Sequence, residues 1–158
     1  MSLLPFFQWC DGTSIGVAIR ASRWLFPVIE AIHLLGLTAL LGTVIVLDLR
    51  LLGLGLRRQP VWRVASELSR VMTGSVLAML GSGTLLFLSE ALKCYSSPPF
   101  RVKMVCLFLA LLFHYTAFRG IAKGKAAEAR PGLAKVVGLV SFTLWISVGL
   151  AGRAIGFY

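Results

Sequence analysis

The sequence predicts an all-α membrane protein, with four transmembrane helices in an up-down-up-down bundle and a short N-terminal interfacial helix. Of the 158 residues, 58% are hydrophobic, and the mean hydropathy is +0.86. A soluble domain of this size needs far more polar surface. Only 14% of the residues are charged, and they form short clusters between long apolar runs, as membrane-spanning helices require. We expect a single transmembrane four-helix domain over residues 1–158.

The elements are justified in chain order by their polar boundaries. Residues 11–22 are expected to form the interfacial helix, with Asp11 or Thr13 as its N-cap and with Trp9 and Trp24 in the aromatic belt. Arginine and lysine clusters end each apolar run, and the segment 94–100 is a predicted turn because two prolines interrupt a helix. The predicted spans are 24–54, 71–92, 102–121 and 133–157.

Basic residues are distributed unevenly between the two sides of the membrane. Ten lie on the side of the loops that follow the first and third spans, and six lie on the other side. The excess is expected to be cytoplasmic, so both termini would be periplasmic in a bacterial inner membrane. The ten are Arg50, Arg57, Arg58, Arg63, Arg70, Arg119, Lys123, Lys125, Arg130 and Lys135, and the six are Arg20, Arg23, Lys93, Arg101, Lys103 and Arg153.

The net charge of +10 is then explained by topology signals and by contact with anionic lipid headgroups. A nucleic-acid partner is not expected, because no basic segment is interleaved with aromatic residues. The N-terminus lacks the basic region of a signal peptide, so we expect the first helix to be retained. Membrane lipid is therefore the first predicted partner.

The two histidines, His33 and His114, both fall inside predicted spans. His33 lies eight residues after Leu25 and His114 eleven residues after Lys103. At 1.5 Å per residue, these positions are about 12 Å and about 16 Å below the outer interface. The first and third spans are diagonal in an up-down-up-down bundle. We therefore predict that both imidazoles bind the iron of one haem b from opposite faces.

Basic and small residues are assigned around that haem. Its propionates would reach Arg20, Arg23, Arg101 or Lys103 near the outer interface. Gly36, one turn from His33, would give the flat macrocycle room near the helix backbone. Small-residue stripes on the other spans would do the same, although they are also common in ordinary membrane helix packing. The stripes contain Ala110 and Ala117; Gly74, Ala78 and Gly81; and Gly138, Ser141 and Gly152, the last group together with Trp145.

Glu30 shares a helix face with His33 and lies one turn nearer the outside. Because ionisable groups at membrane depth are costly, we expect a functional role: a hydrogen bond to a ligand imidazole, a proton path, or pairing with a nearby arginine. A di-iron site needs a second Glu-x-x-His motif, which is missing. Glu90 is expected to pair with Lys93 at the interface.

Two further sets of residues remain open at this point. Asp48 and Arg50 lie near the inner end of the first span, where they could pair within or between helices. Cys10 and Cys94 fall on the outer side, where a disulfide could form. Cys106 is expected to be a small core residue.

Two stretches carry a resemblance to known proteins: EAIHLLGLTALLGTVIVLDLRLLGLGL at residues 30–56 and SEALKCYSSPPFRVKM at residues 89–104. With them, nearly the whole chain resembles a family of small uncharacterised bacterial four-helix membrane proteins. That family is distantly similar to the membrane domain of the copper-resistance protein CopD and to HemJ-like proteins. Both begin with a membrane histidine and a glycine-bearing helix, which His33, Gly36 and Gly42 match. The resemblance implies a four-helix fold and a haem-related role.

The first functional hypothesis is a b-type cytochrome subunit that carries electrons between a periplasmic redox partner and the quinone pool or another membrane subunit. The short loops leave no room for a catalytic domain, so an accessory role is favoured over a stand-alone enzyme. A second hypothesis is a metal-ion or proton transport module that uses Glu30, His33, Glu90 and His114. A third is a non-catalytic scaffold subunit of a larger membrane complex.

Overall fold

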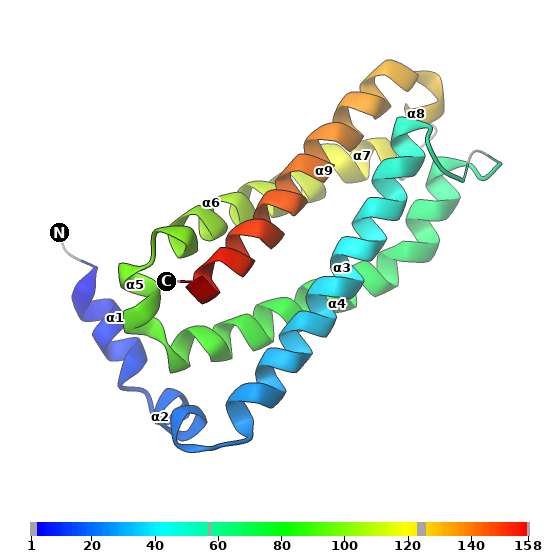
Figure 1. Cartoon of the computed structure of the whole chain (residues 1–158). Helices are drawn as coiled ribbons and strands as arrows, with labels where there is room; N and C mark the ends of the chain where they lie inside the picture. The colour runs from blue at the N-terminus through cyan, green and yellow to red at the C-terminus, as the bar shows by residue number, and fades with distance from the viewer. Residues whose placement is uncertain (1–2, 57, 123–125, 158) are drawn as a thin grey trace.

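The computed structural model describes residues 3–56, 58–122 and 126–157 (Figure 1). Four helical segments are long and apolar enough to cross a membrane. They are α3 (Leu25–Leu52), α4 (Val61–Ser89), α6 (Pro98–Phe113) with its continuations η1 (His114–Phe118) and α7 (Arg119–Ala122), and α9 (Pro131–Ala154), which ends in η2 (Ile155–Phe157). The protein is therefore an all-α, multi-pass membrane protein that contacts lipid, as predicted. Arg57, Lys123 and Lys125 lie outside the described residues.

The long helices form a ring that is open on one side. α3 packs along α4 and along α9, and α9 packs along α6, but α4 and α6 do not pack along each other. Figure 1 shows the pair α3/α4 meeting the pair α6/α9 near α8 (Ala126–Ala129) and parting from it toward α1 (Leu4–Asp11). We call these two ends of the bundle the α8 end and the α1 end. Consecutive long helices are thus not always neighbours, because α4 and α6 do not pack together. We call this missing contact the missing α4–α6 seam.

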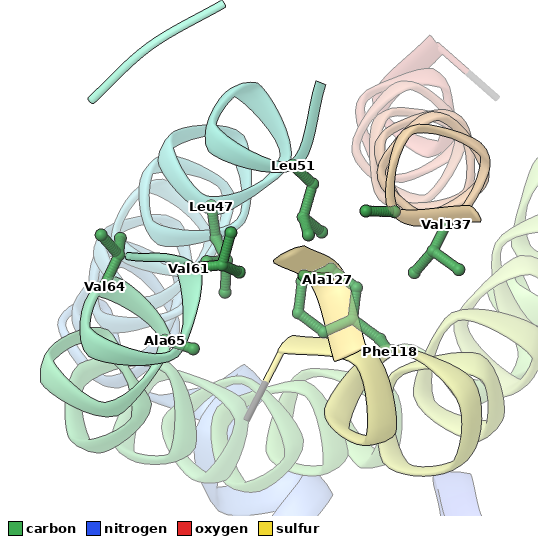
Figure 2. Close-up of a cluster of buried hydrophobic side chains, with 9 residues drawn as sticks. Leu47, Leu51, Val61, Val64, Ala65, Phe118, Ala127 and Val137 are labelled. Carbon is green, nitrogen blue, oxygen red and sulfur yellow. The ribbon is translucent and has the colours of Figure 1, made fainter. Parts of the chain in front are cut away.

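The α8 end is closed by a compact apolar core. Phe118 of η1 is 1% exposed and lies at its centre, between α3 and α4 on one side and α9 on the other (Figure 2). Close van der Waals packing of these side chains holds the helix pairs together at this end, because lipid tails give membrane helices no hydrophobic driving force to associate. The cluster contains Leu47, Leu51, Val61, Val64, Ala65, Phe118, Ala127, Ala134 and Val137.

Three short helices cover the α1 end: α1, α2 (Ser14–Ala21) and α5 (Ala91–Ser96). Thr13 caps α2 by accepting a hydrogen bond from the Gly16 amide at 3.3 Å, as expected for an N-cap. Arg20 of α2 links these short helices to α4. Its guanidinium donates to the backbone carbonyl of Ser89 at 2.7 Å and to the backbone carbonyl of Asp11 at 2.7 Å. The predicted interfacial helix corresponds to α2, and α1 is a further helix that was not predicted.

Two long helices begin earlier than the hydropathy pattern indicates. α4 begins at Val61, ten residues before the predicted span, because its first turns are amphipathic: Val61 is buried while Arg63 and Glu67 pair at 3.1 Å on the outside. α6 begins at Pro98, inside the predicted turn. Proline is tolerated in the first turn of a helix, where its missing amide would have had no partner.

Candidate functional site

A cavity of about 460 Å³ lies between the two helix pairs toward the α1 end. Small-molecule sites have volumes of this order. All four long helices and α1 contribute to its wall, which is almost entirely apolar. His33 from α3 and Lys103 from α6 are the ionisable side chains among the described residues that line it. Because the α4–α6 seam is missing, that side of the cavity faces lipid in a bilayer.

His33 is held against α4 in a defined orientation. Its Nδ1 lies 2.9 Å from the Ser82 hydroxyl, and that hydroxyl donates to the Ala78 carbonyl at 2.5 Å. Since the Ser82 proton is used in this way, Ser82 accepts a hydrogen bond from Nδ1–H, which leaves the Nε2 lone pair of a neutral imidazole without a proton. Ligand histidines are commonly oriented by such a bond through the other ring nitrogen.

Gly83 gives the imidazole its space on α4. A Cβ at this position would lie 3.2 Å from His33 Cε1 and 3.6 Å from Nδ1. These distances show that the Nδ1–Cε1 edge of the ring lies against α4. Ser82 and Gly83 were both missed by sequence analysis, which placed the small-residue face of this helix at Gly74, Ala78 and Gly81. Those two glycines are exposed, and a Cβ on either would meet nothing within 4 Å.

Lys103 reaches the cavity from the opposite wall. Its side chain lies over Gly152 of α9, where a Cβ would be 3.5 Å from Cε and 3.6 Å from Nζ. Among the described residues, no carboxylate forms an ion pair with Lys103. The cavity thus presents one hydrogen-bond acceptor and one cation in an apolar setting.

Aromatic side chains close the cavity at the α1 end. Phe87 of α4 stacks on Phe100 of α6, with ring centroids 5.7 Å apart and planes inclined by 11°. Phe7 of α1 meets Phe87 edge-on at 5.5 Å and approaches Tyr95 of α5 at 5.2 Å. The Phe87–Phe100 pair is therefore a bridge between the two helices that otherwise do not pack together.

His114 does not face His33. It is buried in a small separate cavity of about 30 Å³, beside Leu47 of α3 and Phe118 of η1. Leu47 comes fourteen residues after His33, a distance of about 21 Å along the helix. The prediction that His33 and His114 lie at similar membrane depths is wrong, because α6 begins at Pro98 rather than at residue 102. His114 is therefore sixteen residues from the start of its helix, or about 24 Å.

The residues present do not fit a haem held by two histidines. Two axial imidazoles must approach one iron from opposite faces of the same macrocycle, whereas His33 and His114 line different cavities. Nor do the described residues bring three or more His, Cys, Asp or Glu side chains together in a group that could hold a metal ion.

The remaining predicted site residues lie outside the cavity wall. Arg20 donates to the Ser89 carbonyl, and Arg101 donates to the Tyr95 carbonyl at 3.0 Å. Arg23 and Glu30 are exposed. Gly36 faces α4, where a Cβ would lie 3.4 Å from Met79 Cγ, so it serves helix packing. Of the predicted set, the structure therefore brings together only His33 and Lys103.

Three other predictions concerned pairs of polar residues. Glu90 pairs with Lys93 at 3.6 Å, as predicted. Asp48 and Arg50 do not pair: Asp48 is fully buried, and the Arg50 Nε donates to the Gln59 carbonyl at 2.7 Å. Cys10 and Cys94 are both buried near the α1–α5 contact and are present as free thiols.

Comparison with known proteins gives one match. No curated protein and no solved structure matches the chain. One family model matches residues 6–158, which is nearly the whole sequence and includes every residue of the cavity wall. The chain therefore belongs to DUF6644, a family of unknown function.

Proposed function

We propose that this protein is a membrane-embedded electron-transfer subunit that binds the headgroup of a quinol in the cavity between His33 and Lys103. The observation that carries the proposal is the composition of that cavity. An apolar chamber of about 460 Å³ faces lipid on one side and contains two ionisable side chains on opposite walls. A lipid-soluble molecule with two polar ends on a flat apolar ring fits this arrangement.

The chemistry of the two polar groups narrows the ligand class. Nε2 of neutral His33 accepts a hydrogen bond, so the ligand must offer a donor such as a hydroxyl. The Lys103 ammonium donates, so the ligand must offer an acceptor oxygen on its far side. A 1,4-quinol meets both requirements, and its isoprenoid tail could leave between α4 and α6. His33 would then be placed to take a hydroxyl proton as electrons pass to a partner.

A haem ligated by His33 alone is the second candidate, and the Ser82 hydrogen bond favours it. That bond leaves Nε2 available, as is typical of metal-binding histidines. Lys103 would be the cavity's cationic partner for a propionate, and the haem would supply one-electron redox chemistry. This candidate is consistent with the resemblance to CopD and HemJ-like proteins that the sequence suggests at His33, Gly36 and Gly42.

The proposed setting is the bacterial inner membrane with both termini periplasmic. The ten-to-six excess of basic residues supports this orientation. In this orientation the cavity would lie in the periplasmic half. Electrons would then pass to or from a periplasmic redox protein or another membrane subunit. A periplasm-specific reporter fused after Tyr158 should be active, whereas activity of a cytoplasm-specific reporter there would reverse the orientation.

Ligand binding can be measured through Trp145, which is 2% exposed and lines the cavity. Trp9, Trp24 and Trp62 are replaced by Phe, so that the fluorescence comes from Trp145 alone. The protein is reconstituted in quinone-free lipid and titrated with a 1,4-benzoquinone that carries a decyl tail, before and after reduction to the quinol. We expect saturable quenching, tighter for the quinol because only the hydroxyl form can donate to His33.

The two histidines provide a matched pair of variants. His33→Gln should raise the quinol dissociation constant roughly tenfold, as expected for one lost hydrogen bond in an apolar site. His114→Gln should leave it unchanged, because His114 lines another cavity. Quenching that does not saturate, or that is equal in both variants, would refute quinol binding at this site. A Soret band in protein from haem-sufficient cells, lost in His33→Gln, would select haem instead.

A further inference from the structure

Asp48 is a carboxylic acid sealed inside the bundle, away from the cavity. It lies on α3 and is 0% exposed. α9 approaches this point closely because of Gly138, where a Cβ would lie only 3.3 Å from the Asp48 carbonyl oxygen. Ser141, one turn further along α9, is 1% exposed. Asp48 is therefore enclosed at a helix contact where neither water nor lipid reaches its side chain.

The described residues place no counter-charge at the carboxyl oxygens. Neither Oδ1 nor Oδ2 has a partner at hydrogen-bonding geometry among the described residues, and the side chain that interacts with the carboxyl is the Ser141 hydroxyl. Arg50, two residues along α3, is bound to the Gln59 carbonyl. His114 lines a small cavity whose wall includes Leu47 but not Asp48. The charged residues of α4, α7, α8 and α9 near this end point outward: Arg63, Glu67, Arg70, Arg119, Glu128 and Lys135 are all exposed.

A carboxylate in this position would carry a very high desolvation cost, because no cation among the described residues offsets its charge. A metal ion is a poor counter-ion here, since hard cations take six or more oxygen ligands and the described residues hold no cluster of three acidic, histidine or cysteine side chains. A proton needs one carboxyl oxygen and one neighbouring acceptor. The Asp48 carboxyl and the Ser141 oxygen supply this pair.

We propose that Asp48 and Ser141 form an intramembrane proton-binding site that joins α3 to α9. In the occupied state, the Asp48 O–H donates to the Ser141 oxygen, and the two helices stay in contact at Gly138. Loss of the proton leaves an unpaired charge at this contact, so α3 and α9 must separate enough to admit water. The α3–α9 contact is thereby linked to proton uptake and release.

The position of the site indicates where the proton is exchanged. Asp48 is four residues from Leu52, the last residue of α3, or about 6 Å. It is fifteen residues from His33, or about 22 Å. The site therefore exchanges its proton with the aqueous phase at the α8 end. It is independent of whether a quinol binds at the α1 end, so either proposal can fail alone.

Infrared spectroscopy of the full-length protein in lipid bilayers tests the proposal directly. At pH 7 exposed carboxyls are ionised, so a protonated carboxyl gives a separate carbonyl band. We expect this band in the wild-type protein, its loss in Asp48→Asn, and its retention in Glu67→Gln, which alters an exposed acid paired with Arg63. Ser141→Ala should keep the band but shift its frequency, because the hydrogen bond to the serine is removed.

Transfer to D₂O distinguishes a carboxyl that exchanges its proton with solvent from one that is permanently protonated. The Asp48 band should shift as deuterium replaces the proton within the time of the measurement. A wild-type protein without a protonated-carboxyl band at pH 7 would overturn the proposal, as would a band that survives Asp48→Asn. A band that never shifts in D₂O would also overturn it, since the proton would then be a fixed part of the fold. If Asp48→Asn does not fold, the Ser141→Ala shift decides the assignment.

Discussion

The imidazole of His33 lies edge-on against α4 at Gly83, with 3.2 Å between Cε1 and the position that a Cβ would occupy. This contact and the 2.9 Å bond to Ser82 fix the ring in two ways. Gly83 sets how close the ring lies to α4, and Ser82 sets which nitrogen carries the proton. Together they turn an otherwise costly intramembrane histidine into a rigid acceptor on the wall of an apolar cavity.

Gly83→Ala should weaken quinol binding without unfolding the protein. The new methyl group is too close to Cε1, so the ring must shift by a few tenths of an ångström and its bond to Ser82 is strained. We expect the dissociation constant to rise about fivefold, or roughly 1 kcal/mol, in the Trp145 quenching assay. Gly81→Ala is the matched control, because a Cβ there meets nothing within 4 Å. Equal affinities in the two variants would contradict the role assigned to Gly83.

Lys103→Met should have opposite effects on binding and on stability. The ammonium is partly buried without a carboxylate partner among the described residues, so replacing it by an apolar side chain of similar length removes a desolvation cost. The melting temperature should therefore rise, while quinol affinity should fall roughly tenfold through loss of one charge-assisted bond. Lys135→Met, at an exposed position of α9, should change neither quantity. If the Lys103→Met protein binds quinol with wild-type affinity, Lys103 is not part of the site.

The sequence was sufficient to predict the four helices because their signal is compositional. Each long helix contains an apolar window of bilayer length, and charged residues interrupt the pattern between them. The early starts of α4 and α6 were harder to predict. They depend on a proline that can begin a helix as well as end one, and on an amphipathic extension that continues past the apolar run.

The candidate site could be predicted only in part, because it depends on how helices pair. His33 and Lys103 were identified as ionisable residues at membrane depth, a property of each residue alone. Their common cavity follows from the missing α4–α6 seam, which no local pattern encodes. His114 was assigned to the same site because the start of α6 was placed several residues too late. The pairing of Asp48 with Arg50 remained open in the sequence, because burial of Asp48 against α9 is a property of the fold.

Gly138→Ala should destabilise the protein by loosening the contact between α3 and α9. Its Cβ would lie 3.0 Å from Leu51 Cβ and 3.3 Å from the Asp48 carbonyl oxygen, and neither group is the free end of a flexible side chain. We expect a loss of about 1–3 kcal/mol, typical of an overpacked interior, measured as a lower melting temperature in lipid. Gly74→Ala in α4, where a Cβ meets nothing within 4 Å, should be neutral or slightly stabilising. Equal melting temperatures for the two variants would disprove close packing at Gly138.

Cys94 tests the closure of the α1 end, because its reactivity depends on burial. Burial, and to a smaller extent the Glu90 carboxylate, raise the pKa of the Cys94 thiol from 9.0 to about 11. At pH 8 a thiol with this pKa has roughly a hundredfold less thiolate than an ordinary thiol, and the thiolate is the species that is alkylated. In a reduced Cys10→Ser, Cys106→Ser protein, the rate of reaction with maleimide should therefore rise about tenfold per pH unit from pH 7 to pH 9 without levelling off.

The denatured chain is the control. It should react at least a hundredfold faster at pH 8, and its rate should level off above pH 9, as that of an ordinary thiol does. Reaction of the folded protein at the denatured rate would mean that α1 and α5 do not cover Cys94 in the membrane.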